Sequence, residues 1–278
     1  MASTETSSRL EAAFRQGRPS LVAYLMGGYP DRAGSLEALR AVALAGADVI
    51  ELGVPYADPL ADGPVIQRAA AVARTQEGGF GLAETLELAT AAAALEGMPP
   101  IVVMTYLNPM MRMGFATVAE KAAEAGVAGF IVPDLPPDNP IATQWAAAAA
   151  VNGIDTVFLA APTSTPERLA LVGERSSGFV YVVSSLGVTG ERAELPVELT
   201  ALVGRVRAAT SLPVAVGFGV STPGQAASVA AIADGVIVGS ALVKRQQDVA
   251  ALGDFVASLA SAVRGLTDCS AEFAEPSD

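Results

Sequence analysis

Three carboxylates lie close together where an apolar run gives way to a proline-rich loop. The stretch reads IELGVPYADPLADGPVIQ (50–67), and its acids are Glu51, Asp58 and Asp62. The chain contains no histidine, one cysteine and two lysines. Nucleophiles activated by an imidazole are therefore excluded, and zinc, which usually takes histidine or thiolate ligands, is a poor match. We expect proton transfer to depend on carboxylates and tyrosine, with no metal.

Glu51 is the sharpest candidate among these acids. It follows the residues DVI (48–50), and strand alternation gives it the same inward direction as one set of apolar neighbours. Burial raises the pKa of a carboxyl group toward neutral, so such an acid can give or take a proton near pH 7. The competing interpretation is a glutamate in an ion pair or hydrogen-bonded to backbone, and position alone does not separate the two.

Asp58 and Asp62 allow two interpretations. In DPLADGP either aspartate can turn back onto its own backbone or cap the helix expected from Pro64. A loop aspartate can also close over a substrate and accept a hydrogen bond from it. Both interpretations stay open at this point.

Eight short apolar runs alternate with segments of helical spacing. Most of the runs are continuously apolar, as expected for parallel strands that are buried on both faces. The expected strands are 20–26, 48–54, 101–106, 129–134, 155–160, 178–185, 213–218 and 234–239. The expected helices are 35–47, 81–97, 117–127, 139–153, 165–176, 194–210, 222–233 and 248–263.

This alternation predicts an α/β protein with the (β/α)8 TIM-barrel fold, as a single domain over residues 1–265. An N-terminal helix at 8–16 is expected to close the bottom of the barrel. Extra short helices are expected within GPVIQRAAAVART (63–75) and after residue 240, and residues 266–278 are expected to form a flexible tail. The alternative, an open doubly wound sheet, lacks a G-x-G-x-x-G motif after the first strand. Loops that follow barrel strands meet on one face, so the opening stretch lies on that face.

Glycines in three successive late loops indicate a phosphate site. GVTG (187–190), GFGVS (217–221) and GS (239–240) follow the last three expected strands, and a short helix follows Ser240. Glycine lets backbone N–H groups approach an anion, and barrels commonly bind phosphate in this region. A Schiff base is a poor match, because Lys121 falls on an outer helix and Lys244 lies beyond the last strand. The expected substrate is a small phosphorylated molecule.

The charge balance and the ends of the chain exclude other classes. A formal charge of −12, without a basic cluster, argues against binding to nucleic acid or anionic membranes. The first twenty residues lack the apolar core of a secretory signal, and no apolar run is long enough to span a membrane. We expect a cytoplasmic protein. Cys269, in the polar tail, has no cysteine to pair with and is expected to be a solvent-facing thiol.

The chain resembles the tryptophan synthase alpha chain family. Similar segments occur in the same order over about residues 8–265: IELGVPYADPLADGPVIQ, MTYLNPM, VPDLP, FLAAPTSTPERL, YVVSSLGVTG, VGFGVSTP and VGSALVK. The resemblance implies retro-aldol cleavage of indole-3-glycerol phosphate to indole and glyceraldehyde 3-phosphate, a lyase step in tryptophan biosynthesis. This reaction uses neither a Schiff base nor a metal, in agreement with the residues that the chain lacks.

The resemblance also implies roles for individual residues. Glu51 matches the acid-base glutamate, and Asp62 matches the aspartate that holds the indole N–H. Tyr181 matches a tyrosine beside the substrate, and Tyr24 stands where the family often has phenylalanine against the indole, although a core aromatic is an equal alternative. Other matches line the pocket or steady loops (Tyr106, Asp134, Thr189) or contact phosphate (Gly190, Gly219, Gly239, Ser240). Leu186 and the segment ERAE (191–194) depart from the family pattern.

A partner is implied by the resemblance alone. Family members pair with a pyridoxal-phosphate beta chain in an αββα assembly, so the cofactor belongs to the partner and none is expected in this chain. Positions at or near that contact are matched by Asp58, Pro59, Asn108 and Pro136. Three alternatives remain: a lyase that works without a partner, another phosphosugar isomerase or lyase, and a barrel that only binds or activates a partner.

Overall fold

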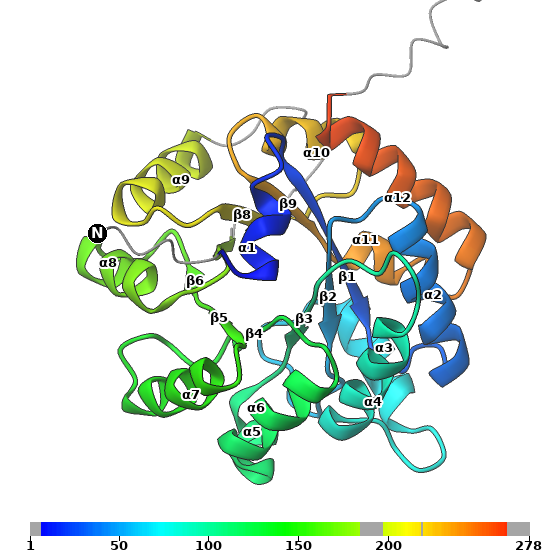
Figure 1. Ribbon diagram of the computed structural model, residues 1–278. Coiled ribbons are helices and arrows are strands. Elements are labelled where there is room, and N and C mark those ends of the chain that lie inside the picture. The colour runs from blue at the N-terminus through cyan, green and yellow to red at the C-terminus, as the bar shows by residue number, and fades with distance from the viewer. Residues whose placement is uncertain (1–6, 184–196, 218, 266–278) are drawn as a thin grey trace, which may run out of the picture.

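The computed structural model describes residues 7–183, 197–217 and 219–265. Within these ranges the strands form one parallel sheet, and helices surround it (Figure 1). The expected tail at 266–278 lies outside the described residues, as do Cys269, Leu186, the ERAE segment, Thr189 and Gly190.

Each predicted strand is present, and the fifth is divided in two. The strands of the described residues are β1 (Ser20–Met26), β2 (Val49–Gly53), β3 (Ile101–Met104), β4 (Gly129–Ile131), β5 (Asp155–Val157), β6 (Leu159–Ala160), β7 (Val180–Val183), β8 (Val214–Gly217) and β9 (Gly235–Val238). Their order in the sheet is β5-β4-β3-β2-β1-β9-β8-β7-β6. Because β5 and β6 are consecutive halves of one segment broken at Phe158, one half pairs with β4 and the other with β7. The sheet thereby closes into the predicted TIM barrel.

The helices alternate with the strands as the sequence predicts. In the described residues they are α1 (Arg9–Phe14), α2 (Arg32–Leu44), α3 (Pro64–Arg74), α4 (Leu82–Ala93), α5 (Leu107–Met113), α6 (Phe115–Glu124), α7 (Pro140–Val151), α8 (Pro166–Arg175), α9 (Val197–Ala209), α10 (Pro223–Ala230), α11 (Ser240–Val243) and α12 (Val249–Val263). Helix α5, which contains Asn108 and Pro109, was not predicted from the sequence. Proline is tolerated there because it lies in the first turn, whose N–H groups have no partner within the helix.

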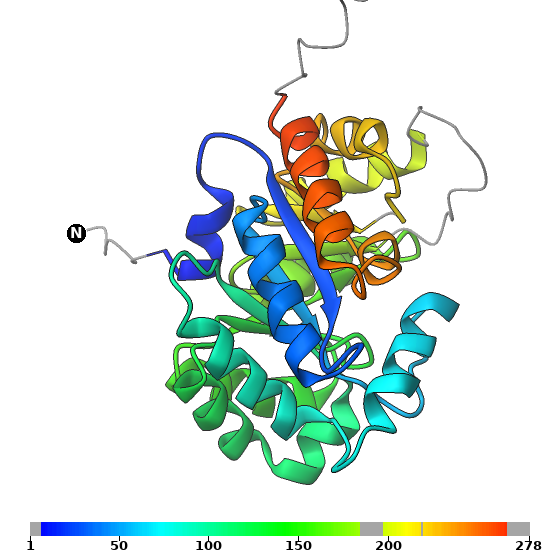
Figure 2. The ribbon, with the colours of Figure 1, turned by 90° about the vertical axis from the view of Figure 1, so that its right-hand side faces the viewer.

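Helix α1 closes one end of the barrel, as predicted. Its side chains Leu10 and Phe14 are buried in one cluster with inward residues of the strands, such as Val49 and Ile237. Ser8 begins the helix by accepting a hydrogen bond from the Glu11 N–H. In Figure 2, α1 lies at the left end of the barrel, and β1 runs away from it toward the opposite end. That opposite end receives the carboxyl ends of the strands and therefore carries the expected site.

Two layers of apolar side chains surround the strands. The larger layer lies between the outer faces of the strands and the helices, and includes Leu21, Leu52 and Phe130. A smaller cluster at the carboxyl ends joins Tyr24 and Met26 of β1 to Ala69 and Ala70 of α3 and to α11. The extra helix α3 therefore packs beside the mouth of the barrel.

Candidate active site

Glu51 points into the barrel near its mouth. It lies between Tyr24 of β1 and Val102 of β3 in the register of the sheet, and it has the same inward direction as Val49. Its side chain is 1% exposed. Neither carboxylate oxygen has a hydrogen-bond partner among the described residues, and none of the ion pairs there includes it. The competing interpretation, a glutamate in an ion pair or hydrogen-bonded to backbone, is therefore not supported.

The two site acids have separated pKa values. Burial, together with the charge of Asp62, raises the pKa of Glu51 to about 8. Burial also raises the pKa of Asp62 to about 6, against the opposing effect of a hydrogen bond from Tyr106. At pH 7 Glu51 is therefore mostly protonated and Asp62 is mostly ionised. A protonated acid beside an anion suits a reaction that delivers a proton and stabilises a developing positive charge.

Asp62 is held by a tyrosine and does not cap the following helix. The N-cap of α3 is Gly63, and no side chain bonds to its first turn, so neither Asp58 nor Asp62 acts as the cap. The hydroxyl of Tyr106 accepts a hydrogen bond from the Ala61 N–H at 3.0 Å, and it lies close enough to the Asp62 carboxylate to lower its pKa. Asp62 is half-buried. The loop thus turns a carboxylate toward the barrel mouth.

Two tyrosines flank the acids, the buried Tyr24 and the half-buried Tyr181, and two glycines make room for them. A Cβ added to Gly53 would lie 2.2 Å from the Tyr24 hydroxyl, and one added to Gly217 would lie 2.6 Å from the Tyr181 hydroxyl. Both glycines occupy inward positions at the ends of their strands. Burial, followed by the charges of the two acids, raises the pKa of each tyrosine, so both stay neutral hydroxyl groups.

Sequence reasoning missed Gly53 and Gly217. Their signal is a glycine at an inward position of an otherwise apolar strand, which marks a close approach. Tyr24 is buried, as the alternative of a core aromatic predicts. The same ring nevertheless also lies beside the acids.

Three of the expected phosphate residues lie within the described residues. Gly219 follows β8 with a φ of +68°, a conformation that favours glycine. Gly239 and Ser240 follow β9, where Gly239 is the N-cap of α11. The position of a Cβ on Gly239 would be 3.8 Å from the ring and Cβ of Tyr24, so this end of the site adjoins that tyrosine. Thr189 and Gly190 lie outside the described residues.

The expected partner positions follow three neighbouring strands. Asp58 and Pro59 come after β2, Asn108 comes after β3, and Pro136 comes after β4. Asp58 and Asn108 are exposed, and Pro59 and Pro136 are half-buried. Asp134, in the last of these loops, accepts a hydrogen bond from the Leu107 N–H at 2.9 Å and so fixes the start of α5.

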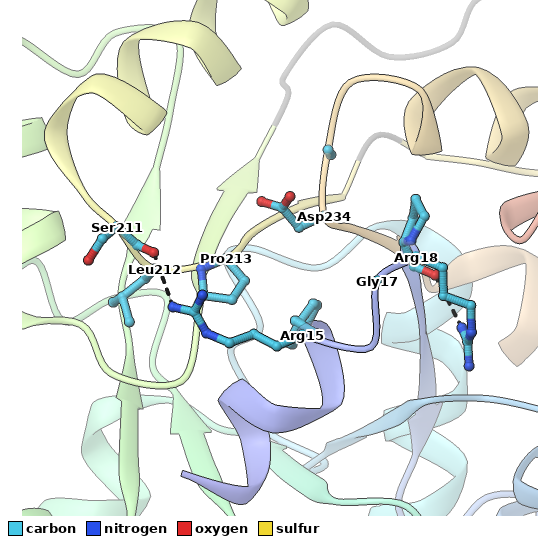
Figure 3. A pocket seen from close by; sticks show the side chains of 10 residues that line it. Arg15, Gly17, Arg18, Ser211, Leu212, Pro213 and Asp234 are labelled. Carbon is cyan, nitrogen blue, oxygen red and sulfur yellow. Dashed lines mark hydrogen bonds between the residues drawn. The ribbon is translucent and has the colours of Figure 1, made fainter. Parts of the chain in front are cut away.

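A cavity at the opposite end of the barrel contains none of these residues. It has a volume of about 520 Å³ and lies between α1 and the loops before β1, β8 and β9 (Figure 3). Arg15 bonds to Glu11 and to the Ser211 carbonyl, and Arg18 bonds to Asp48, so both of its arginines are already engaged. The chemistry therefore belongs to the carboxyl end.

The described residues hold no candidate metal centre. No three cysteine or acidic side chains among residues 7–183, 197–217 and 219–265 gather as ligands. Both lysines are exposed, with Lys121 on the outer helix α6, as the sequence analysis expected. No helix in the described ranges is both long and apolar enough to cross a bilayer.

Comparisons with known proteins show the family of this chain. Residues 10–269 match the family model of the tryptophan synthase alpha chain. The chain belongs to the tryptophan synthase alpha chain family. It is 46% identical to the alpha chain of Caulobacter vibrioides over 248 residues, 89% of each chain, and 47% identical to that of Streptomyces coelicolor over 86% of each chain. It superposes on tryptophan synthase from Mycobacterium tuberculosis with a TM-score of 0.85 and 45% identity, covering 93% of this chain and 99% of that one.

Members of the tryptophan synthase alpha chain family are lyases. They cleave indole-3-glycerol phosphate to indole and glyceraldehyde 3-phosphate in tryptophan biosynthesis. The family identification and the barrel predicted from the sequence are therefore confirmed. The reaction agrees with a site that offers one protonated and one ionised carboxyl group.

Proposed function

We propose that Glu51 is the acid-base residue of this lyase reaction. The observation that carries the proposal is a carboxyl group that is 1% exposed, points into the barrel mouth and has no hydrogen-bond partner among the described residues. Leaving such a group unpaired costs free energy, so it is retained where a ligand completes its bonding. A substrate hydroxyl and ring carbon would supply the missing partners.

One carboxyl group can perform both proton transfers. Protonated Glu51 delivers its proton to the indole ring carbon that bears the side chain. The resulting carboxylate then takes the proton of the neighbouring hydroxyl. As that hydroxyl becomes an aldehyde, the bond between the two carbons breaks and its electron pair returns to the ring, which releases indole and glyceraldehyde 3-phosphate. Glu51 ends the cycle protonated, as it began.

Asp62 acts in this proposal on the other side of the indole. Protonation of the ring carbon places positive charge on the ring nitrogen, and an ionised carboxylate that accepts the indole N–H stabilises that charge. The pKa of about 6 supports this role, since Asp62 is then mostly ionised at pH 7. Its hydrogen bond from Tyr106 fixes the direction of the carboxylate. The rings of Tyr24 and Tyr181 form walls for the indole and its side chain.

The phosphate group would bind at the loops that follow β7, β8 and β9. Gly219, Gly239 and Ser240 offer backbone N–H groups there, and we assign Thr189 and Gly190 to the same end from their sequence positions. The closeness of Gly239 to Tyr24 supports a site in which the phosphate and the aromatic ring are held side by side.

We further propose a beta-chain partner in an αββα assembly in the cytoplasm, with pyridoxal phosphate in the partner and no cofactor in this chain. Support comes from the resemblance to tryptophan synthase from Mycobacterium tuberculosis. The contact would include Asp58, Pro59, Asn108 and Pro136. These four lie in neighbouring loops on the face that carries Glu51, so a product leaving the barrel mouth would meet the partner directly.

An assay of indole release tests the proposed roles. Purified chain is supplied with indole-3-glycerol phosphate, with and without a beta chain, and Glu51→Gln is compared with the parent. We expect Glu51→Gln to lose at least about a hundredfold in turnover, the usual scale of a general acid-base group. Binding of inorganic phosphate should change little, and the melting temperature should not fall. Near-normal turnover of Glu51→Gln would exclude the acid role, and no indole release by the parent under either condition would favour a barrel that only binds a partner.

A further inference from the structure

A tyrosine hydroxyl joins the Asp62 end of the loop after β2 to the barrel. Hydrogen bonds within the loop are local, from Leu60 N–H to the Asp58 carbonyl and from Asp62 N–H to the Pro59 carbonyl. The bond from Ala61 N–H to Tyr106 crosses to the segment that follows β3. The Tyr106 hydroxyl is therefore one of the contacts that fix the part of the loop next to Asp62.

A second tyrosine supports that ring. Tyr56 stacks on Tyr106 with ring centroids 5.0 Å apart and an angle of 26° between the ring planes. Stacked aromatic pairs at this spacing gain energy beyond the burial of their area. The Tyr56 hydroxyl accepts a hydrogen bond from Asn108 Nδ2 at 3.1 Å. Tyr56 is thus held at its hydroxyl and presents one face of its ring to Tyr106.

These contacts form a continuous series from the surface to the site. Asn108 bonds to Tyr56, Tyr56 stacks on Tyr106, and the Tyr106 hydroxyl bonds to Ala61 of the loop and lies beside the Asp62 carboxylate. We propose that Tyr56 is a positioning residue for the cleavage reaction, which acts by fixing Tyr106 and, through it, Asp62. This inference rests on the role proposed above for Asp62. It adds a residue that touches neither the acids nor the phosphate end.

The surroundings of Tyr56 make it a suitable residue to change. It is half-buried, and with Asn108 it lines a cavity of about 550 Å³ on the outer side of the loop. A smaller side chain there leaves space that is already open to solvent, so the barrel core keeps its packing. Tyr56→Leu removes the stacking ring, whereas Tyr56→Phe keeps the ring and removes only the bond to Asn108.

Kinetics of the full chain with a beta chain test the proposal. Release of glyceraldehyde 3-phosphate from indole-3-glycerol phosphate is measured for Tyr56→Leu, Tyr56→Phe, Tyr106→Phe and Asp62→Asn. We expect Tyr56→Leu to lower kcat/KM by about threefold to tenfold, the scale of one aromatic pair, and Tyr56→Phe to lose less. In the Tyr106→Phe background, Tyr56→Leu should cause no further loss, because its effect passes through the Tyr106 hydroxyl.

The pH dependence of kcat/KM distinguishes a positioning role of Tyr56 from a role in packing alone. Without the Tyr56 ring, Tyr106 is held less firmly and interacts less with Asp62, so the pKa of Asp62 should rise. The acidic limb of the pH profile of kcat/KM should therefore move to higher pH in Tyr56→Leu. Phe14→Leu, which removes a similar aromatic contact with Phe179 at the closed end, is the matched control and should leave that limb in place. An unchanged limb in Tyr56→Leu, or equal losses with and without the Tyr106 hydroxyl, would overturn the inference. Full activity in Asp62→Asn would instead contradict the proposed function.

Discussion

Tyr24 and Glu51 are register partners on the adjacent parallel strands β1 and β2, and both side chains point into the mouth of the barrel. The tyrosine hydroxyl lies over Gly53, the next inward position beyond Glu51. Glu51 is therefore covered by an aromatic ring on one side and by the apolar barrel interior below. This arrangement excludes water from the carboxyl group and explains why its pKa is raised.

The separated pKa values predict a bell-shaped pH dependence of kcat/KM. Asp62 must be ionised, so activity should fall as the pH drops through about 6. Glu51 must be protonated, so activity should fall again as the pH rises through about 8. Initial rates of indole release between pH 5 and pH 9.5 check both limbs, whose apparent values belong to the interacting pair. A flat profile across this range would contradict the assignment of the two acids.

The raised pKa of Glu51 also predicts how stability changes with pH. Between the unfolded pKa of about 4.5 and the folded pKa of about 8, the unfolded chain ionises while the folded chain keeps its proton, so stability falls as pH rises. Glu51→Gln has no such loss. Its advantage in free energy of unfolding should grow by a few kcal/mol from pH 5 to pH 8 in urea titrations. Glu120→Gln, at an exposed position on α6, is the control and should show no such growth.

Replacing Gly53 with alanine should lower activity while the fold is retained. Because a Cβ at this position would lie 2.2 Å from the Tyr24 hydroxyl, Gly53→Ala forces the ring to move. A misplaced wall beside the reacting groups should lower kcat/KM by about tenfold to a hundredfold. Gly63→Ala, in the loop that follows β2, is a matched control, because no atom lies within 4 Å of the added Cβ. If both variants match the parent in indole release, the close approach has no catalytic consequence.

Much of the fold was predictable because the signal is local. Continuous apolar runs and helical spacing predicted the barrel and the exact extent of β1, and strand alternation predicted the inward direction of Glu51. The division of the fifth strand at Phe158 was not predictable, since it depends on which half meets which neighbour. Helix α5 was missed because Asn108 and Pro109 favour a turn when read without the capping contact from Asp134.

The site was only partly readable from the sequence. Residue types directed attention to Glu51, Asp58 and Asp62, because the chain offers few other groups for proton transfer, and the family resemblance then selected Glu51 and Asp62. The pairs that shape the site join segments far apart in the chain, such as Gly217 with Tyr181 and Tyr56 with Tyr106. The periodicity of a sequence contains no information about contacts between distant segments. These pairs could therefore be identified only from the structure, in which the barrel brings the loops together.

A substitution at Asp48 should have the opposite effect to one at Gly53. The fold should lose stability, while catalysis is retained. Asp48 is 8% exposed at the start of β2, and its carboxylate accepts hydrogen bonds from both Arg18 Nη atoms, from Arg264 and from the Leu21 N–H. These bonds join the C-terminal end of α12 to β1 and β2 at the closed end of the barrel. Asp48→Asn removes the charge that compensates two arginines, so we expect a loss of about 2–4 kcal/mol in free energy of unfolding. Urea titration measures this loss, and kcat at 25 °C should stay within about twofold, because the lost contacts lie at the end of the barrel opposite Glu51. A large fall in kcat with unchanged stability would mean that the closed end takes part in the reaction.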